Sequence, residues 1–172
     1  MSQYTIAILG GGPGGYVAAI KAAQLGTKTV LIEGGELGGV CLNEGCIPTK
    51  TLLKSAKVYQ DILGSEKYGI RIGNQGEISL DWGAMLQRKD RVVSQLTSGV
   101  KNLLQQNGVE VVRGFGEVKD PHTIIVDGQS ISAQHLIIAT GSRATILPIP
   151  GLDKALESGL AVTSTGAPSL AE

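Results

Sequence analysis

Three glycines near the N-terminus constrain the fold of this chain more than any other feature of its sequence. They form a Gly-x-Gly-x-x-Gly turn at Gly10, Gly12 and Gly15. An apolar, β-branched run over residues 4–9 precedes the turn and predicts a strand, and an alanine-rich stretch over residues 17–25 follows it and predicts a helix. The segment therefore predicts the first half of a βαβ unit.

An acidic residue follows at the distance that a nucleotide-binding βαβ unit requires. Glu33 ends a second predicted strand, residues 29–32, about twenty residues after the turn. Gly10 permits the tight turn, Gly12 lets the backbone approach a pyrophosphate, and Gly15 lets the helix pack against the strand. The helix N-terminus then faces the phosphates, and Glu33 can accept a hydrogen bond from a ribose hydroxyl. We predict a dinucleotide site here; the alternative is a turn that is merely rich in glycine.

Both cysteines lie in one glycine-rich segment, residues 38–50, which reads GGVCLNEGCIPTK. The Cys-x4-Cys spacing of Cys41 and Cys46 suggests a redox-active disulfide. A structural disulfide that closes so short a loop would stabilise weakly. Zinc would need further ligands, and His122 and His135 lie far along the chain, so we expect no metal site. Two unrelated buried cysteines remain an alternative, because free cysteine often serves as a small hydrophobic residue.

The spacing also constrains the backbone between the two cysteines. Residues five apart in a straight α-helix lie at least about 7.5 Å apart along its axis, whereas bridged Cα atoms are rarely more than about 7 Å apart. A bridge from Cys41 to Cys46 therefore requires a turn or a distorted helical start. A helix is predicted over residues 49–63, and Pro48 fits its start. The N-terminus of this helix together with Lys50 would favour a thiolate at Cys46.

The remaining sequence predicts one long helix and several strands. Asp81 is the predicted N-cap of a helix that ends near Gln106, and the charged run Arg88, Lys89 and Arg91 is expected on its solvated face. Strands are predicted over residues 109–112, 123–126, 130–132 and 136–139, with a hairpin turn at Asp127-Gly128. From Ile146 onward the chain is rich in proline, shows no sustained period and is interpreted as a linker.

Composition argues against several classes of partner. The fifteen basic and fifteen acidic side chains of this 172-residue chain cancel, so no net charge attracts nucleic acid or an anionic membrane. No apolar run reaches the roughly twenty residues that a membrane span needs, and the N-terminus lacks the basic region and cleavage site of a secretion signal. We therefore expect one α/β domain in the cytoplasm, where a cysteine pair is more often catalytic than structural.

Together, the glycine turn, Glu33 and the cysteine segment resemble the flavoprotein disulfide reductases, a family of pyridine nucleotide-disulfide oxidoreductases, and most closely their dihydrolipoamide dehydrogenase branch. The segments GFG at 114–116 and ATGS at 139–142 fall where that family touches its flavin. The resemblance implies a Rossmann-like FAD-binding domain with a parallel sheet, helices on both faces and a small antiparallel hairpin or meander insertion. Residues 1–147 would form the first segment of this domain, and residues 148–172 a linker toward a nicotinamide-binding domain.

The resemblance also implies roles for individual residues. Cys41 would exchange with a thiol substrate, Cys46 would lie against the flavin as a charge-transfer thiolate, and Lys50 would lie near flavin N5. The other implied cofactor-binding residues are Gly10, Gly12, Pro13, Gly14 and Gly15 at the pyrophosphate, Glu33 at the adenosine ribose, Gly116 near the adenine, and Gly38, Gly39, Val40, Ala139, Thr140, Gly141 and Ser142 elsewhere along the flavin.

The chemistry implied by the resemblance is a two-electron relay. A dithiol would reduce the disulfide, the pair would pass two electrons to FAD, and a hydride would pass to NAD. The implied partners are dihydrolipoamide on the lipoyl domains of 2-oxo acid dehydrogenase complexes or on the glycine cleavage H protein. The NAD site, the homodimer contacts and the catalytic base are expected outside this chain, and neither His122 nor His135 matches that base. The alternatives are another family reductase, of glutathione or mercuric type, and a flavin-binding module without turnover.

Overall fold

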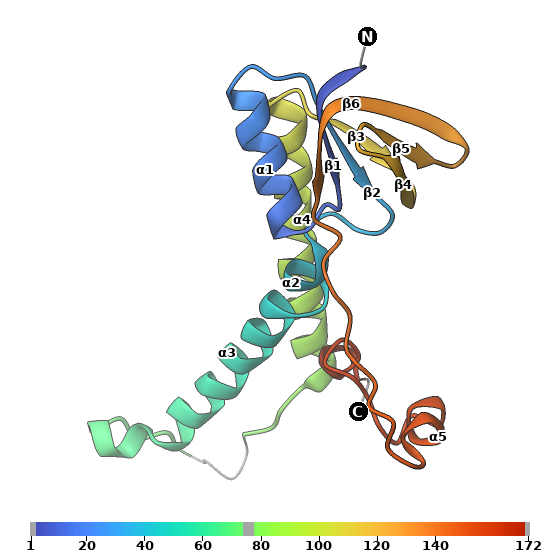
Figure 1. The fold of residues 1–172 in the computed structure, drawn as a ribbon. Coiled ribbons are helices and arrows are strands. Elements are labelled where there is room, and N and C mark those ends of the chain that lie inside the picture. The colour runs from blue at the N-terminus through green and yellow to red at the C-terminus, as the bar shows by residue number, and fades with distance from the viewer. Residues whose placement is uncertain (1–2, 74–77, 171–172) are drawn as a thin grey trace.

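The computed structural model describes residues 3–73 and 78–170, and its centre is a six-stranded sheet in the order β3-β2-β1-β6-β5-β4 (Figure 1). The strands are β1 (Tyr4–Leu9), β2 (Thr29–Glu33), β3 (Glu110–Arg113), β4 (Gly116–Asp120), β5 (Thr123–Val126) and β6 (Gln129–Ile138). The helices are α1 (Pro13–Gln24), α2 (Gly39–Asn43), α3 (Cys46–Leu63), α4 (Trp82–Gln106) and α5 (Leu152–Glu157), with short 3-10 helices η1 (Ser65–Tyr68) and η3 (Ala167–Ser169).

Strands β3, β2, β1 and β6 are parallel neighbours, so their carboxyl ends meet at one edge of the sheet. At that edge, Gly10 N–H donates to the Ile32 carbonyl at 2.8 Å, and Ala139 N–H donates to the Leu9 carbonyl at 2.8 Å. The segments that follow β1, β2 and β6 are thereby held side by side. In open α/β sheets this is the edge where ligands bind.

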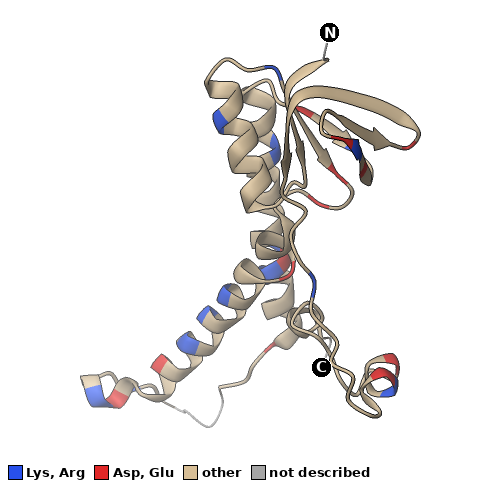
Figure 2. Ribbon diagram, viewed as in Figure 1, with Lys and Arg blue, Asp and Glu red and all other residues tan. Residues whose placement is uncertain are grey.

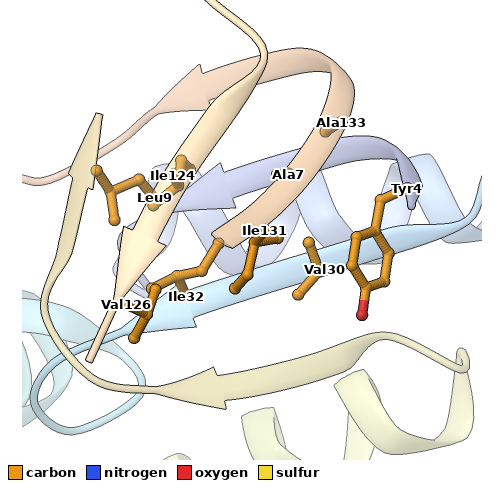
Figure 3. Close-up of a cluster of buried hydrophobic side chains, with 9 residues drawn as sticks. All are labelled: Tyr4, Ala7, Leu9, Val30, Ile32, Ile124, Val126, Ile131 and Ala133. Atoms are coloured by element: carbon orange, nitrogen blue, oxygen red, sulfur yellow. The ribbon is translucent and has the colours of Figure 1, made fainter. Parts of the chain in front are cut away.

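The two faces of the parallel strands are covered differently. Helices α1 and α4 pack on one face, over a buried cluster that includes Ile8, Leu31 and Leu104. Antiparallel strands cover the other face, where residues of β1 and β2 meet residues of β5 and β6 (Figure 3). The predicted α/β class, parallel sheet and antiparallel insertion are confirmed. The prediction of helices on both faces is wrong for the described residues, because the antiparallel strands occupy the second face.

Strand β6 joins the two parts of the sheet. Its first half pairs antiparallel with β5 from Gln129 to Ser132, and its second half pairs parallel with β1 from Ala133 to Ile138. The prediction of two separate strands here is wrong, because one strand serves both pairings. Asp127 and Gly128 both have positive φ, at 49° and 79°, as the predicted hairpin turn requires. Strand β4 has no counterpart among the predicted strands.

Helix α4 confirms its predicted start and corrects one prediction on its surface. Ala84 N–H donates to Oδ1 of Asp81 at 2.8 Å, so Asp81 is the N-cap. Lys89, predicted to be solvated, is only 7% exposed, and its ammonium lies 2.9 Å from a carboxylate oxygen of Asp90. Lys89 lies on the same side of α4 as Val100, because the spacing between the two residues is close to a whole number of helical turns.

Helix α3 extends away from the sheet, and lysines recur along it (Figures 1 and 2). Arg88 of α4 donates to the Thr51 carbonyl of α3 at 3.3 Å, which ties the two helices together.

The stretch interpreted as a linker contains α5 and η3, which are too short to show a period in the sequence. None of the helices in the described part of the chain is long and apolar enough to span a bilayer.

Candidate functional site

The glycine turn after β1 leaves no room for side chains at two of its positions. Gly10 has φ +108°, and a Cβ there would lie 2.2 Å from the Ala139 carbonyl oxygen. A Cβ on Gly15 would lie 1.7 Å from the Gly10 carbonyl oxygen. Gly15 therefore lets α1 begin directly against the turn, and the amides of Gly15 and Tyr16 both donate to the Gly12 carbonyl at 2.9 Å. This agrees with the predicted roles of Gly10 and Gly15.

Glu33 is fixed at the end of β2 by two backbone amides. Gly11 N–H donates to its Oε2 at 2.5 Å and Gly35 N–H donates to its Oε1 at 2.6 Å. Each carboxylate oxygen can accept a further hydrogen bond. The half-buried carboxylate is therefore held in place beside the glycine turn, with acceptor capacity left for a hydroxyl group.

The cysteine segment rests directly on the glycine turn. Gly38 N–H donates to the Gly11 carbonyl at 2.8 Å. Gly39 has φ +59°, and a Cβ on it would lie 2.7 Å from the Cα of Gly12. The side-chain amide of Asn43 donates to the carbonyls of Leu37 and Gly39 at 3.1 and 2.9 Å, which holds the single turn of α2 in place.

The two cysteines lie on either side of a break between helices. Cys41 is in α2, Gly45 breaks the helical path at φ −128° and ψ −100°, and Cys46 is the first residue of α3. The predicted distortion between the cysteines is thus present, and α3 begins earlier than predicted, with Pro48 in its first turn. Both thiols are free; Cys41 is half-buried and Cys46 is exposed.

The environment of Cys41 favours its neutral thiol. A hydrogen bond with the Cys46 thiol raises the pKa of Cys41 above its ordinary value, and burial raises it further. The charge of Lys50, which is exposed one turn into α3, acts in the opposite direction on the pKa of Cys41 but more weakly. The two thiol groups therefore interact directly.

These segments line one cleft of about 610 Å³ at the carboxyl edge of the sheet. Of the residues predicted to bind a cofactor, those lining it are Gly10, Gly12, Pro13, Gly14, Glu33, Gly39, Val40, Cys41, Ala139, Thr140, Gly141 and Ser142. The predicted residues outside this lining are Gly15, Gly38, Cys46, Lys50 and Gly116. The structure thus brings the glycine turn, Glu33 and Cys41 together around one space.

Gly116 and the two histidines lie outside the cleft. A Cβ on Gly116 would lie 2.6 Å from a methyl of Leu9 and 2.9 Å from a methyl of Ile124, so core packing alone accounts for glycine there. His122 lies against the Gln134 carbonyl, with its Nδ1 at 3.0 Å, and His135 is exposed on β6. Neither histidine lines the cleft.

Comparison with known proteins decides the family. A family model described as pyridine nucleotide-disulphide oxidoreductase matches residues 4–172. The chain belongs to the pyridine nucleotide-disulphide oxidoreductase family. Membership of this family implies that the chain binds FAD.

Several curated members of this oxidoreductase family are similar to the chain. It is 53% identical over 162 residues to the dihydrolipoyl dehydrogenase of Acholeplasma laidlawii, an alignment that covers 94% of this chain and 48% of that relative. It is 43% identical to the Mycoplasma pneumoniae enzyme of the same name, over 98% of this chain and 36% of the relative. It is 45% identical to the mitochondrial dihydrolipoyl dehydrogenase of Dictyostelium discoideum, over 98% of this chain and 34% of the relative. The chain thus spans a third to a half of the length of these relatives.

The cleft also contains residues that were not predicted to bind a cofactor. They are Glu36, Asn43 and Glu44. Asn43 and Glu44 lie between the two cysteines, and their approach to the cleft depends on α2 forming a helical turn, which was not predicted. Glu36 carries no motif signal; its carboxylate lies 3.6 Å from the Arg113 guanidinium.

Proposed function

We propose that this chain is the part of a dihydrolipoyl dehydrogenase that binds FAD through the cleft and carries the redox-active cysteine pair. The contact between Gly39 and Gly12 is the observation on which the proposal rests, because it joins the cysteine segment to the phosphate-binding turn as one unit. The similarity to proteins named dihydrolipoyl dehydrogenase supports this branch of the family over the others.

The cleft fits the pyrophosphate and ribose of FAD. A Cβ on Gly12 would meet nothing nearer than 3.7 Å, so the absent side chain leaves open space where α1 begins. Lysine and arginine are missing from the lining among the described residues, so backbone amides and the dipole of α1 would stabilise the phosphates. Gly12, Pro13 and Gly14 would hold the pyrophosphate, Glu33 the adenosine ribose, and residues 139–142 would lie along the remainder of the cofactor.

The cysteine pair supplies the thiol chemistry. In the oxidised protein, one thiolate of dihydrolipoamide attacks Sγ of Cys41, which forms a mixed disulfide and releases Cys46 as a thiolate. The second substrate thiol then closes the lipoamide ring and releases Cys41. The substrate is oxidised, the pair is reduced by two electrons, and the two substrate protons pass to the protein or to solvent. Bound FAD would supply a two-electron acceptor beside the pair, with Lys50 nearby, and NAD would be the final acceptor.

The proposal extends to the partners, the oligomeric state and the location of the whole protein. Its partners would be lipoyl domains of 2-oxo acid dehydrogenase complexes or the glycine cleavage H protein, with which a homodimeric, cytoplasmic enzyme would react. A glutathione or mercuric type of reductase would share the turn and the cysteine spacing. The identity of the preferred dithiol separates these alternatives.

The chain itself can be tested in three steps. Purified protein is reconstituted with FAD, and flavin retained after gel filtration is measured; the proposal predicts retention, and a colourless protein contradicts it. Mass spectrometry after mild oxidation should then show a bond between Cys41 and Cys46. Dihydrolipoamide should reduce that bond faster than glutathione does, and Cys41→Ser should abolish the exchange while flavin remains bound. Flavin binding without any exchange would instead favour a flavin-binding module.

A further inference from the structure

Helix α2, which carries Cys41, is too short to hold its own position. It has five residues, Gly39–Asn43, and isolated helices shorter than about 12–15 residues are marginal in water. No side chain caps its N-terminus, where Gly38 and Gly39 have φ of +100° and +59°. The position of the Cys41 thiol therefore depends on contacts that α2 makes with the rest of the chain.

The two ends of α2 are held differently by the backbone. Leu37, just before the helix, is only 3% exposed, and Gly38 N–H donates to the Gly11 carbonyl at 2.8 Å, so the start of α2 is anchored. After its other end comes Gly45, whose φ of −128° and ψ of −100° separate α2 from α3. The backbone beyond α2 therefore does not continue the helix.

The side chain of Asn43 ties the end of α2 back to its anchored start. Its amide nitrogen donates to the Leu37 carbonyl at 3.1 Å and to the Gly39 carbonyl at 2.9 Å. Both partners are acceptors, so both N–H groups of the amide are used. Leu42 also packs into the core beneath α2, but apolar burial is non-directional. The hydrogen bonds of Asn43 therefore fix the orientation of the turn that carries Cys41.

This arrangement places the two thiols next to each other. Both are free, and Cys41 shares a hydrogen bond with Cys46 across the break at Gly45. A thiol pair that is already held in place loses little conformational freedom when it closes. We infer that Asn43 is a positioning residue that holds Cys41 opposite Cys46, so that the reduced pair closes to a disulfide without reordering the loop. The inference rests on the proposed function, because it presupposes that the pair is redox-active.

Equilibration of the full chain with glutathione measures how readily the pair closes. One molecule of oxidised glutathione takes two electrons and two protons from the cysteine thiols and leaves as two molecules of reduced glutathione, while the thiols become a disulfide. Asn43→Ala and Asn43→Asp both remove the two donors. Because the loop must then be ordered each time the bond forms, the equilibrium constant for closure should fall by about tenfold in each variant.

Asn107 supplies the matched control. Its side-chain amide donates to the Leu103 carbonyl at 2.8 Å at the end of α4, so it makes the same kind of contact away from the cleft. Asn107→Ala and Asn107→Asp should leave the equilibrium constant within about twofold of wild type. All four variants should keep a cooperative thermal unfolding transition.

The pH dependence of Cys41 alkylation gives a second readout. Asn43→Ala adds no charge, so its effect on the thiol comes from the position of α2. A looser pair weakens the hydrogen bond between the thiols, and the alkylation rate of Cys41 should therefore rise at lower pH than in wild type. A role of Asn43 in stability alone would leave this pH dependence unchanged.

Equal closure constants in wild type and both Asn43 variants would overturn the inference and leave the proposed function standing. An equal fall in the Asn43 and Asn107 variants, or loss of folding in both Asn43 variants, would also overturn it, because Asn43 would then support the whole domain rather than the pair. A wild-type chain whose cysteines form no bond with each other at any ratio of oxidised to reduced glutathione would refute the proposed function, and the inference with it.

Discussion

Gly39 packs backbone to backbone on Gly12, and the contact leaves no room for a side chain at position 39. The Cβ that any other residue would bring to position 39 would lie 2.7 Å from the Cα of Gly12. The contact joins two segments to which the proposal assigns different chemistry, since Gly12 belongs to the turn proposed to face the phosphates and Gly39 begins the helix that carries Cys41. The proposed redox pair and the proposed cofactor site therefore lie on segments in direct backbone contact.

Replacing Gly39 with alanine should disturb both functions at once. Because φ is +59° and the new Cβ would press on Gly12, we expect a loss of about 1–3 kcal/mol in the free energy of unfolding and weaker FAD binding. Urea denaturation and flavin titration measure the two effects. Gly99→Ala is the matched control, because a Cβ there meets nothing within 4 Å and alanine favours the interior of α4. Wild-type FAD affinity in Gly39→Ala would contradict the coupling.

Alanine substitutions at Gly12 and Gly15 should affect FAD binding and the free energy of unfolding differently. Gly15→Ala places a Cβ 1.7 Å from the Gly10 carbonyl oxygen, so the backbone must shift, and we expect a loss of at least about 2 kcal/mol in unfolding free energy. Gly12→Ala meets ordinary contact distances and should unfold within about 0.5 kcal/mol of wild type. Its methyl group would nevertheless stand where the pyrophosphate approaches, so FAD binding should weaken. Equal unfolding free energies and equal FAD affinities of Gly12→Ala and Gly15→Ala would argue against these separate roles of the two glycines.

The reduced chain should show a high pKa at Cys41. Its hydrogen bond with the Cys46 thiol, then burial, raise the pKa of Cys41 above the ordinary value of about 8.5. Alkylation of Cys41 should therefore be slow at neutral pH and increase only at higher pH. Cys46→Ala removes the first cause and should shift the rate profile toward lower pH. An unchanged dependence of the alkylation rate on pH in Cys46→Ala would show that the thiols do not interact.

The raised pKa of Cys41 also affects stability. It stabilises the fold below about pH 8.5, and this contribution is lost as pH rises through the higher folded pKa.

Tyr4 should titrate well above an ordinary tyrosine. Burial, and then the hydrogen bond from its hydroxyl to Glu110 at 2.7 Å, raise the pKa of Tyr4 from 10.0 to about 12. Because the folded pKa is raised, the stabilisation is complete below pH 10 and is lost as pH rises through 12. Unfolding free energies measured across this interval should fall more steeply in wild type than in Tyr4→Phe. Parallel curves for the two proteins would exclude this role for Tyr4.

The βαβ unit and the cofactor turn were predictable because their physical requirements are local. Gly10 has a φ of +108° and Gly15 packs on the Gly10 carbonyl oxygen within the turn, and the apolar strands on either side are continuous in the sequence. The N-cap at Asp81 was predictable for the same reason, since a single side chain and the next turn of helix determine it.

Features that depend on distant packing were not predictable from the pattern. Strand β4 reads GEVKD and is mostly exposed, so it shows neither an apolar run nor alternation. Lys89 was expected in solvent because its neighbours are charged, yet it lies on the buried side of α4. The second face of the sheet is covered by β5 and β6 rather than by helices, which follows from the bend of β6 and not from any single segment. Glu36 lines the cleft from the loop after β2 and Glu44 lines it from the end of α2, so no local pattern assigns either residue to the cleft.

The central claim is that the cleft holds FAD beside the Cys41/Cys46 pair, and absorbance during two-electron reduction of the FAD-reconstituted chain tests it most directly. If Cys46 lies against the flavin, the wild-type chain should develop a long-wavelength charge-transfer band as the disulfide is reduced. Cys46→Ser should bind FAD and lack the band. A wild-type chain that binds FAD and is reduced without any such band would contradict the account.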